Sequence, residues 1–274
     1  MLTSEQKKAI RQLQKKVQQK DAIKLKLNWD LLASERAETK MQGFFHYDAE
    51  GNLLGFFAVF CFGNKVECVG MVDPTARRRG IARVLLESVM EEWRGHVKRF
   101  LLNTPENSTS GHLFIEAVGG VYAFTEHEMM CSEVPLPASL TGMRIRPAVL
   151  DDGEAIYRLD ADGFGMTTNE ARSLYAGDGA RVGTYMIEEH NEVVGKLRLD
   201  RQKGESWIFG FVVAKEKRGR GIGRAALTDI VHREVTAGNQ VWLEVAVNNA
   251  SALSLYQSCG FKKVQGAQCY YDMA

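Results

Sequence analysis

An apolar run, Trp207-Ile208-Phe209-Gly210-Phe211-Val212-Val213, leads into the basic loop Arg218-Gly219-Arg220-Gly221-Ile222-Gly223. Apolar residues then recur at the three- and four-residue spacing of a helix, beginning at Ile222 and ending at Ile230. Glycines let a backbone fold closely around a ligand, the first N–H groups of a helix have no partner within it, and arginines add positive charge. The stretch therefore predicts a strand, a loop and a helix that together bind a pyrophosphate.

The same pattern occurs earlier in the chain, in Val72-Asp73-Pro74-Thr75-Ala76-Arg77-Arg78-Arg79-Gly80-Ile81-Ala82. The sequence numbers of Arg77 and Arg218 differ by 141. Two further features recur in the same order, a glycine after a turn (Gly55 and Gly195, an offset of 140) and an asparagine after an apolar run (Asn107 and Asn249, an offset of 142). Three features at nearly one offset predict a duplicated domain.

We expect two domains in the 274 residues, an N-terminal one at 1–131 and a C-terminal one at 143–274. Residues 132–142 hold two of the five prolines and have the composition of a linker. Each copy is predicted to run strand, one or two helices, strand hairpin, third strand, basic loop, helix, strand, helix, last strand. Strands that alternate with helices in this way belong to the α/β class.

Charge and composition exclude several classes of protein. The chain has 35 Lys and Arg against 34 Asp and Glu, so no overall field draws it to nucleic acid or to an anionic membrane. Five cysteines without a C-x-x-C pair suggest neither a disulfide framework nor a zinc site, and we expect no metal. Because no segment resembles a signal peptide or a membrane span, we expect a cytoplasmic protein.

The N-terminal stretch from Ser4 to Lys26 carries eight basic residues against two acids. Ile10, Leu13 and Val17 would share one face of a helix over this stretch. We expect an amphipathic surface helix that is capped by Thr3 or Ser4. A membrane or nucleic-acid role for this stretch is the alternative.

A dinucleotide-binding fingerprint is the first rival for the basic loop, because residues 221–226 satisfy G-x-G-x-x-A and Glu244 follows on a later strand. In that fold, however, the first glycine closes a tight turn at the end of the strand. Here the residues from Ala214 to Arg220 separate the strand from Gly221, and the earlier copy has Ala82 in place of the second glycine. The pattern therefore disfavours a nicotinamide cofactor.

Both loops resemble the Arg/Gln-x-x-Gly-x-Gly/Ala signature with which the GNAT family of N-acetyltransferases binds acyl-CoA. The second copy resembles the family further in Leu243-Glu244-Val245, in Asn249-Ala250-Ser251-Ala252, in Leu255-Tyr256 and in Gly260-Phe261, and its opening Arg144-Ile145-Arg146-Pro147-Ala148 resembles the family's first strand. The resemblance covers residues 143–274 firmly and about 1–130 more loosely. It implies, for each copy, a mixed and mostly antiparallel twisted sheet flanked by helices.

The resemblance also implies a reaction, the direct attack of an amine on the thioester of acetyl-CoA in a ternary complex. Tyr256 stands where the family donates a proton to the departing thiolate, and Glu244 is the candidate base, with a structural role for either side chain as the alternative. Asn249 is expected to cap a helix and to touch CoA through its amide. The expected CoA-binding residues are Phe211, Val212, Val213, Arg218, Gly219, Arg220, Gly221, Ile222, Gly223, Arg224, Asn249 and Tyr256, and in the first copy Val72, Arg77, Arg78, Arg79, Gly80, Ile81 and Ala82.

The first copy is expected to be catalytically degenerate. An offset of 142 in sequence number places Leu102 at the position of Glu244 and Phe114 at that of Tyr256, and neither side chain can move a proton. Glu67 near the end of a strand is a possible substitute base, though an ordinary edge carboxylate is the simpler interpretation. An intact and a degenerate copy together resemble tandem enzymes of the mycothiol synthase type. The first copy could still bind CoA, or could only shape the substrate cleft.

We therefore expect an acetyl-CoA-dependent N-acetyltransferase that acts through its C-terminal copy on the primary amine of a small molecule or a peptide, with no nucleic-acid or membrane partner. A non-enzymatic acyl-CoA sensor or adaptor is the alternative. Nucleic-acid binding by the arginines of the two loops is disfavoured by the neutral charge of the chain. The acceptor would be selected by residues 152–181, and the sequence leaves its identity and the oligomeric state open.

Overall fold

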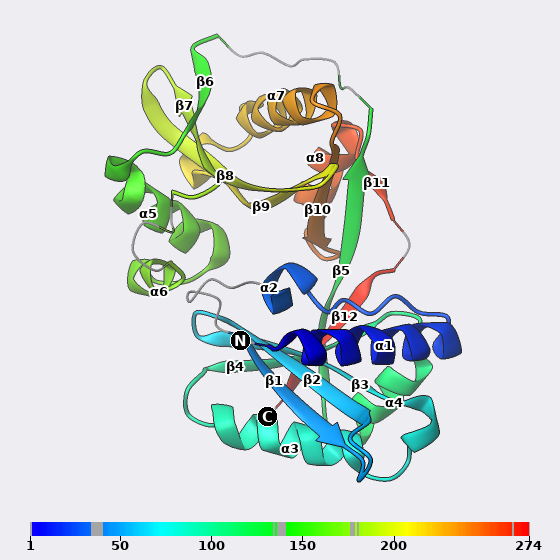
Figure 1. Cartoon of the computed structure of the whole chain (residues 1–274). Helices are drawn as coiled ribbons and strands as arrows, with labels where there is room; N and C mark the ends of the chain where they lie inside the picture. Colours follow the sequence, from blue (N-terminus) through cyan, green and yellow to red (C-terminus); the bar gives the residue numbers. More distant parts are fainter. Residues whose placement is uncertain are drawn as a thin grey trace. The chain divides into compact units, whose positions relative to one another are not determined.

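Strands and helices alternate along the chain in the computed structural model, which describes residues 2–33, 41–133, 135, 141–175, 179, 181–264 and 266–273 (Figure 1). The chain divides into two compact units. Unit 1 comprises Met1–Thr125 and Gly266–Ala274, and unit 2 comprises Glu126–Gln265. Mixed, mostly antiparallel sheet flanked by helices confirms the predicted fold class.

Unit 1 orders its strands β1-β2-β3-β4-β12-β5, of which β3 and β4 are parallel. Its elements are α1 (Ser4–Asp21), α2 (Trp29–Ala33), β1 (Met41–Tyr47), β2 (Leu53–Phe62), β3 (Lys65–Val72), the 3₁₀ turn η1 (Pro74–Ala76), α3 (Ile81–Trp93), β4 (Arg99–Pro105), α4 (Thr109–Ala117), the first part of β5 (Val121–Cys131) and β12 (Gln268–Met273).

Helix α1 confirms the predicted amphipathic surface helix. Thr3 caps it by accepting a hydrogen bond from the backbone N–H of Gln6, and the Gln6 side chain accepts one from the Thr3 N–H in return. Ile10, Leu13 and Val17 are buried. In the described residues no strand precedes α1, so the opening strand predicted for the first copy is wrong.

Two apolar cores lie on opposite faces of the sheet of unit 1. Alternation along β2 sends Phe56 and Phe60 toward α1 and α2, and Phe57 and Val59 toward α3 and α4. Side chains are buried on both faces of β2, which explains why the strand is apolar almost throughout. A strand that is covered on both faces typically has a continuous apolar run rather than an alternating pattern.

Unit 2 orders its strands β5-β10-β9-β8-β7-β6, and the short β11 also pairs with β5. Its elements are the second part of β5, β6 (Met143–Pro147), η2 (Leu150–Asp152), α5 (Gly153–Phe164), α6 (Thr168–Ser173), β7 (Thr184–Glu189), β8 (Glu192–Gln202), β9 (Glu205–Val213), η4 (Lys215–Lys217), α7 (Ile222–Thr236), β10 (Gln240–Ala246), α8 (Ala250–Ser258) and β11 (Lys262–Lys263). Helix α5 covers one core, and α7 and α8 cover the other.

The last strand of each sequence copy lies wholly or partly in the other structural unit. β12, at the end of the chain, pairs with β4 in unit 1. The second part of β5 pairs with β10 in unit 2, from Val241↔Cys131 to Ala246↔Glu126. The boundaries of the units therefore fall at 125/126 and 265/266, whereas the predicted domains follow the order of the chain. Most of the predicted linker (residues 134 and 136–140) lies outside the described residues.

A bulge in β9 explains the change in offset from 140 to 141. In unit 1, β2 and β3 pair without interruption from Gly55↔Val72 to Phe62↔Lys65. In unit 2 the register shifts between Lys196↔Val212 and Arg198↔Phe209, so two residues of β9 face one residue of β8. One of the two, Gly210, has a φ of 53°, a conformation that favours glycine.

Candidate functional site

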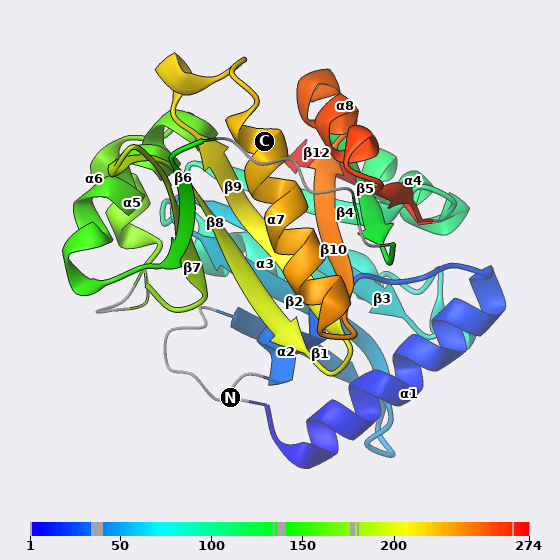
Figure 2. The same ribbon diagram turned by 90° about the horizontal axis from the view of Figure 1, so that it is seen from above.

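Strands β9 and β10 separate at their carboxyl ends. They pair in parallel from Gln240↔Glu205 to Leu243↔Ile208, although β9 continues to Val213 and β10 to Ala246. Alternate backbone N–H and C=O groups of β9 beyond Ile208 therefore face the opening rather than a parallel partner. Helix α7 packs over the same two strands (Figure 2).

The basic loop ends at an uncapped helix. Gly221 is the N-cap of α7 with a φ of 82°, and, because it is glycine, no side chain caps the helix. The first intrahelical bond runs from the N–H of Ala225 to the carbonyl of Gly221, so the N–H groups of the first turn are available to a ligand. Ile222 is buried in the core and anchors the turn. An anion, and a pyrophosphate in particular, fits such a helix end.

Arginines surround this helix end. Arg218, Arg220 and Arg224 are exposed. Arg218 folds back so that its Nε donates to the carbonyl of Val213 at 2.9 Å, and Arg220 pairs with Glu189 at 3.1 Å. The loop is therefore tied to the end of β9 while its positive charges remain open to solvent, which suits it to hold a phosphate.

Glu244 lies at the first position of β10 beyond the last pair with β9. Val241, Leu243 and Val245 point into the core under α7 and α8, so Glu244 projects from the opposite face, together with Trp242. On that face Trp242 stacks on Trp207 at 5.4 Å between ring centroids. The side chain of Glu244 is half-buried at the opening between the strands, where a base would have to lie.

Tyr256 lies on α8, on the other face of the sheet. It is 9% exposed and packs against Phe261. Burial is the main cause that raises its pKa to about 12, and Cys259 adds to the effect. The phenol therefore carries its proton at neutral pH, which is the form that a general acid needs.

Asn249 caps α8, as predicted. Its Oδ1 accepts a hydrogen bond from the N–H of Ala252 at 3.1 Å. The neighbouring Leu255, with Phe211 and Val213, lies within 4 Å of where a Cβ on Gly223 would stand. These contacts are ordinary van der Waals distances, which explains why alanine is acceptable at the matching position in the first copy, Ala82.

Unit 1 repeats the backbone of this site. β3 and β4 pair in parallel from Lys65↔Arg99 to Cys68↔Leu102 and then separate, and Gly80 caps α3 with a φ of 82°. Glu67 lies within the paired part of β3 and forms an ion pair with Lys65 at 2.6 Å. This contact gives Glu67 a structural partner.

In unit 1, however, the end of α1 contacts both loops at the opening. Asp21 accepts two hydrogen bonds from Arg77, at 2.9 and 2.7 Å, and a third from Ser110 at 3.3 Å. The Asn107 amide donates to the carbonyl of Ala22 at 3.2 Å. The carboxylate of Asp21 thus binds the guanidinium of Arg77, which would otherwise be open to a phosphate.

The register of unit 1 corrects three of the predicted correspondences. Arg99 pairs with Lys65 as Gln240 pairs with Glu205, so the offset between β4 and β10 is 141 rather than 142. Asn103 then matches Glu244, and Ile115 matches Tyr256, in place of Leu102 and Phe114. The helix cap that matches Asn249 is Ser108, not Asn107. The replacements are still unable to act as acid or base, because an amide and an alkyl group do not titrate.

Comparison with known families agrees with this geometry. The sequence pattern of the acetyltransferase (GNAT) family matches residues 153–261, which contain α5 to α8, the basic loop, Glu244 and Tyr256. The chain contains a GNAT acetyltransferase domain.

Relatives of this GNAT domain are acetyltransferases. The chain is 35% identical over 71 residues to a [ribosomal protein bS18]-alanine N-acetyltransferase of Salmonella typhimurium, across 26% of the chain and 48% of that protein, so the match spans about half of the relative. It is 26% identical over 267 residues to a mycothiol acetyltransferase of Saccharomonospora viridis, across 85% of the chain and 80% of that protein. A GCN5-related N-acetyltransferase from Sphaerobacter thermophilus has a similar fold, with a TM-score of 0.75 at 20% identity, across 97% of the chain and 91% of that structure.

Two features of unit 2 were not predicted from the sequence. β5 brings His127 and Glu128 beside β10, with Glu128 directly opposite Glu244. The residues preceding the linker gave no signal for this placement, because alternation predicts a strand but not its neighbour. The second feature is the buried pair of Lys196 and Asp160 behind β9.

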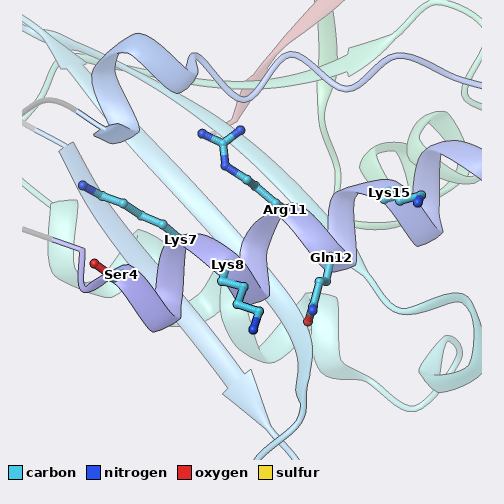
Figure 3. Close-up of a pocket in the computed structure, with 6 residues that line it drawn as sticks. All are labelled: Ser4, Lys7, Lys8, Arg11, Gln12 and Lys15. Atoms are coloured by element: carbon cyan, nitrogen blue, oxygen red, sulfur yellow. The ribbon is translucent and has the colours of Figure 1, made fainter.

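A surface depression of about 490 Å³ runs along α1 and is lined by Ser4, Lys7, Lys8, Arg11, Gln12 and Lys15 (Figure 3). In the part of the chain that the structure describes, no group of three or more His, Cys, Asp or Glu side chains is arranged to hold a metal ion. Nor is any helix of that part both long and apolar enough to cross a membrane.

Proposed function

We propose that unit 2 is an N-acetyltransferase that moves the acetyl group of acetyl-CoA to a primary amine. The observation that carries the proposal is the opening between β9 and β10, where Glu244 lies at the first position of β10 beyond its last pair with β9, and the N-terminal end of α7 lies beside Arg218 and Arg224. This arrangement brings a phosphate-binding helix end and a carboxylate to one gap in the sheet.

In the proposed reaction both proton transfers fall to this chain's residues. Glu244 accepts a proton as the ammonium becomes an amine, whose nitrogen forms a bond to the thioester carbonyl carbon. The C–S bond then breaks with its electron pair on sulfur, and Tyr256 donates a proton to the thiolate. The acetylated nitrogen loses its second proton to give the neutral amide, and this proton restores the phenol of Tyr256. A phenol with a pKa of about 12 is a weak acid, but it is held in its protonated form beside a growing negative charge.

Three contrasts favour unit 2 over unit 1 as the catalytic unit. Unit 1 has Asn103 and Ile115 in place of Glu244 and Tyr256. Its third strand lacks the bulge, and bulges commonly lie next to active sites. Its Arg77 is held by Asp21, so we propose that its loop does not bind CoA. The domain would thus work as an intact member of a tandem pair, without a metal ion and in the cytoplasm.

The acceptor is proposed to be a small molecule or a peptide with a primary amine. Relatives named for mycothiol and for the alanine of a ribosomal protein span both kinds of acceptor. The face of the sheet that carries Glu244 is covered by α5, which differs in sequence from α1 of unit 1, and this helix is expected to select the acceptor.

Turnover of acetyl-CoA by the purified full chain tests the proposal directly. Release of CoA would be followed over a panel of free amino acids, amino sugars, polyamines and peptides with free N-termini. We expect release that depends on at least one amine, together with mass gain of that amine by one acetyl group. Tight binding of CoA without turnover on any amine would instead favour an acyl-CoA sensor.

A further inference from the structure

A buried lysine lies directly behind the bulge of β9. Lys196 on β8 is 0% exposed, and its Nζ is 2.7 Å from Oδ1 of Asp160 on α5. The same Nζ donates to the carbonyl of Gly210, the bulge residue, at 3.3 Å. The second carboxylate oxygen of Asp160 accepts a hydrogen bond from the Tyr175 hydroxyl at 2.6 Å. Four segments of unit 2 thus meet at one ammonium and one carboxylate.

The fold itself does not require a lysine here. The matching residue of unit 1 is Phe56, which is fully buried in an apolar core and pairs with Met71 as Lys196 pairs with Val212. Unit 1 also lacks the bulge. Burial of two charges is costly, and well-packed apolar groups often serve stability equally well. The lysine and the bulge therefore occur together, which points to a role tied to the bulge.

The bulge lies at the opening between β9 and β10, where the orientation of the backbone groups of β9 affects the proposed reaction. It falls between Phe209 and Val212, immediately past Ile208, the last residue of β9 that pairs with β10. An extra residue turns the strand and re-aims its backbone groups toward the opening. Backbone N–H groups aimed at a thioester oxygen stabilise the negative charge that develops there during attack.

We propose that Lys196, fixed by Asp160, is a positioning residue that holds the Gly210 bulge, and with it the free backbone N–H groups of β9, in the orientation that acetyl transfer requires. This proposal rests on the proposed function of unit 2. Asp160 belongs to α5, on the face of the sheet that carries Glu244, so the same pair ties the acceptor side of the site to the acyl-CoA strand.

The test removes both charges together, because either single variant would leave its partner buried and unpaired. In the double variant Lys196→Met/Asp160→Asn, the side-chain amide at position 160 can still accept a hydrogen bond from the Tyr175 hydroxyl. The carbonyl of Gly210, in contrast, loses the hydrogen bond that the lysine donates. We expect kcat to fall roughly 10- to 100-fold, since small misplacements of reacting groups have costs of this size. The dissociation constant of CoA should stay within about threefold, because the basic loop is untouched.

A matched control removes an ion pair at the far end of the same strand. Arg201 donates to Glu234 at 2.6 Å, and Arg201→Met/Glu234→Gln should lower the melting temperature yet leave kcat within about twofold. Amide hydrogen exchange gives a readout that needs no activity: residues 209–213 should exchange faster in the Lys196 double variant only. Unchanged exchange there, or a kcat equal to wild type, would overturn the proposal.

If the double variant does not fold, Gly210→Ala tests the same point with both charges kept. Its Cβ would lie 3.1 Å from Nζ at a φ of 53°, whereas the control Gly204→Ala has a similar φ of 78° and open space around it. Loss of kcat in the first and not in the second supports the proposal, and equal kcat values overturn it. If wild type acetylates no amine, the proposed function fails, and hydrogen exchange still decides whether Lys196 holds the bulge.

Discussion

At the scale of single residues, the two proton transfers are assigned to Tyr256 and Glu244. Tyr256, on α8, is buried, and burial raises its pKa to about 12. Tyr256→Phe removes only the hydroxyl, so the fold should be kept while kcat falls by about 10²–10⁴ at saturating amine. The dissociation constant of CoA serves as the control. An unchanged kcat across pH would show that another group protonates the thiolate.

The pH dependence of wild type follows from the same shift. Burial raises the pKa of Tyr256, so the protonated and active form persists above the ordinary value near 10 and is lost only as pH rises through about 12. We therefore expect no fall in kcat from this group between pH 7 and about pH 10. A fall near the ordinary tyrosine value that Tyr256→Phe abolishes would contradict the assignment.

Glu244→Gln tests the base. The amide cannot accept the ammonium proton, so the reaction would depend on amine that is already deprotonated in solution. We expect the acidic limb of the kcat/KM profile to move to higher pH, with little change at alkaline pH. Glu128→Gln on the facing strand is the matched variant, and an acidic limb that moves only in this second variant would transfer the role to β5.

The sequence predicted best those residues that belong to a local motif. The loop glycines, the cap Asn249 and the candidates Glu244 and Tyr256 all follow from spacing and resemblance. Lys196 and Asp160 do not, because they are far apart in the sequence and nothing local to either marks a buried ion pair. The bulge leaves only one trace, the change of the repeat offset by one across β9.

At the scale of secondary-structure elements, the main departure is the placement of the last strands. Alternating apolar residues predict that a strand exists, but its neighbours are chosen by long-range packing. β12 pairs with β4 in unit 1, where Tyr270 is buried, stacks on Phe124 at 4.7 Å and accepts a hydrogen bond from Lys26 at 3.0 Å. The chain end is therefore part of the core of unit 1.

Tyr270→Ala tests that placement. Removal of a large buried ring typically costs about 3–5 kcal/mol, so unit 1 should lose stability, and amides in residues 41–125 should lose protection from hydrogen exchange. Amides in residues 141–264 should keep their protection. Tyr122→Ala is the control, because Tyr122 is 58% exposed. Loss of protection in residues 141–264 alone would contradict the observed pairing.

The contact between α1 and the first basic loop is also open to test. Arg77 donates to Asp21 and lowers the pKa of that carboxyl, so the contact stabilises the protein above the ordinary value near 3.8 and is lost as pH falls below it. Because solvent partly screens the pair, Asp21→Asn should reduce the free energy of unfolding by only about 1 kcal/mol at pH 7. Urea unfolding should show that this difference shrinks below about pH 4. A difference that is equal at both pH values would rule out the ion pair as its cause.

At the scale of the whole molecule, a duplicated pattern of sequence corresponds to two units with similar backbones and different chemistry. In both units two parallel strands separate at their carboxyl ends, beside a helix whose N-cap residue is glycine. Unit 2 adds the bulge, Glu244 and Tyr256. In unit 1 the carboxylate of Asp21 holds Arg77, whereas the matching Arg218 of unit 2 donates to a backbone carbonyl. We infer that one unit of the two binds and uses acetyl-CoA.

Calorimetric titration of CoA into the full chain tests this inference most directly, with charge reversals at matching positions of the two units. Arg83 and Arg224 are both exposed and stand third in α3 and α7, where glutamate suits a helix start. We predict one CoA bound per wild-type chain, binding weakened about 10-fold or more by Arg224→Glu, and no change with Arg83→Glu. Two CoA molecules per chain, or a loss caused by Arg83→Glu rather than Arg224→Glu, would contradict the account.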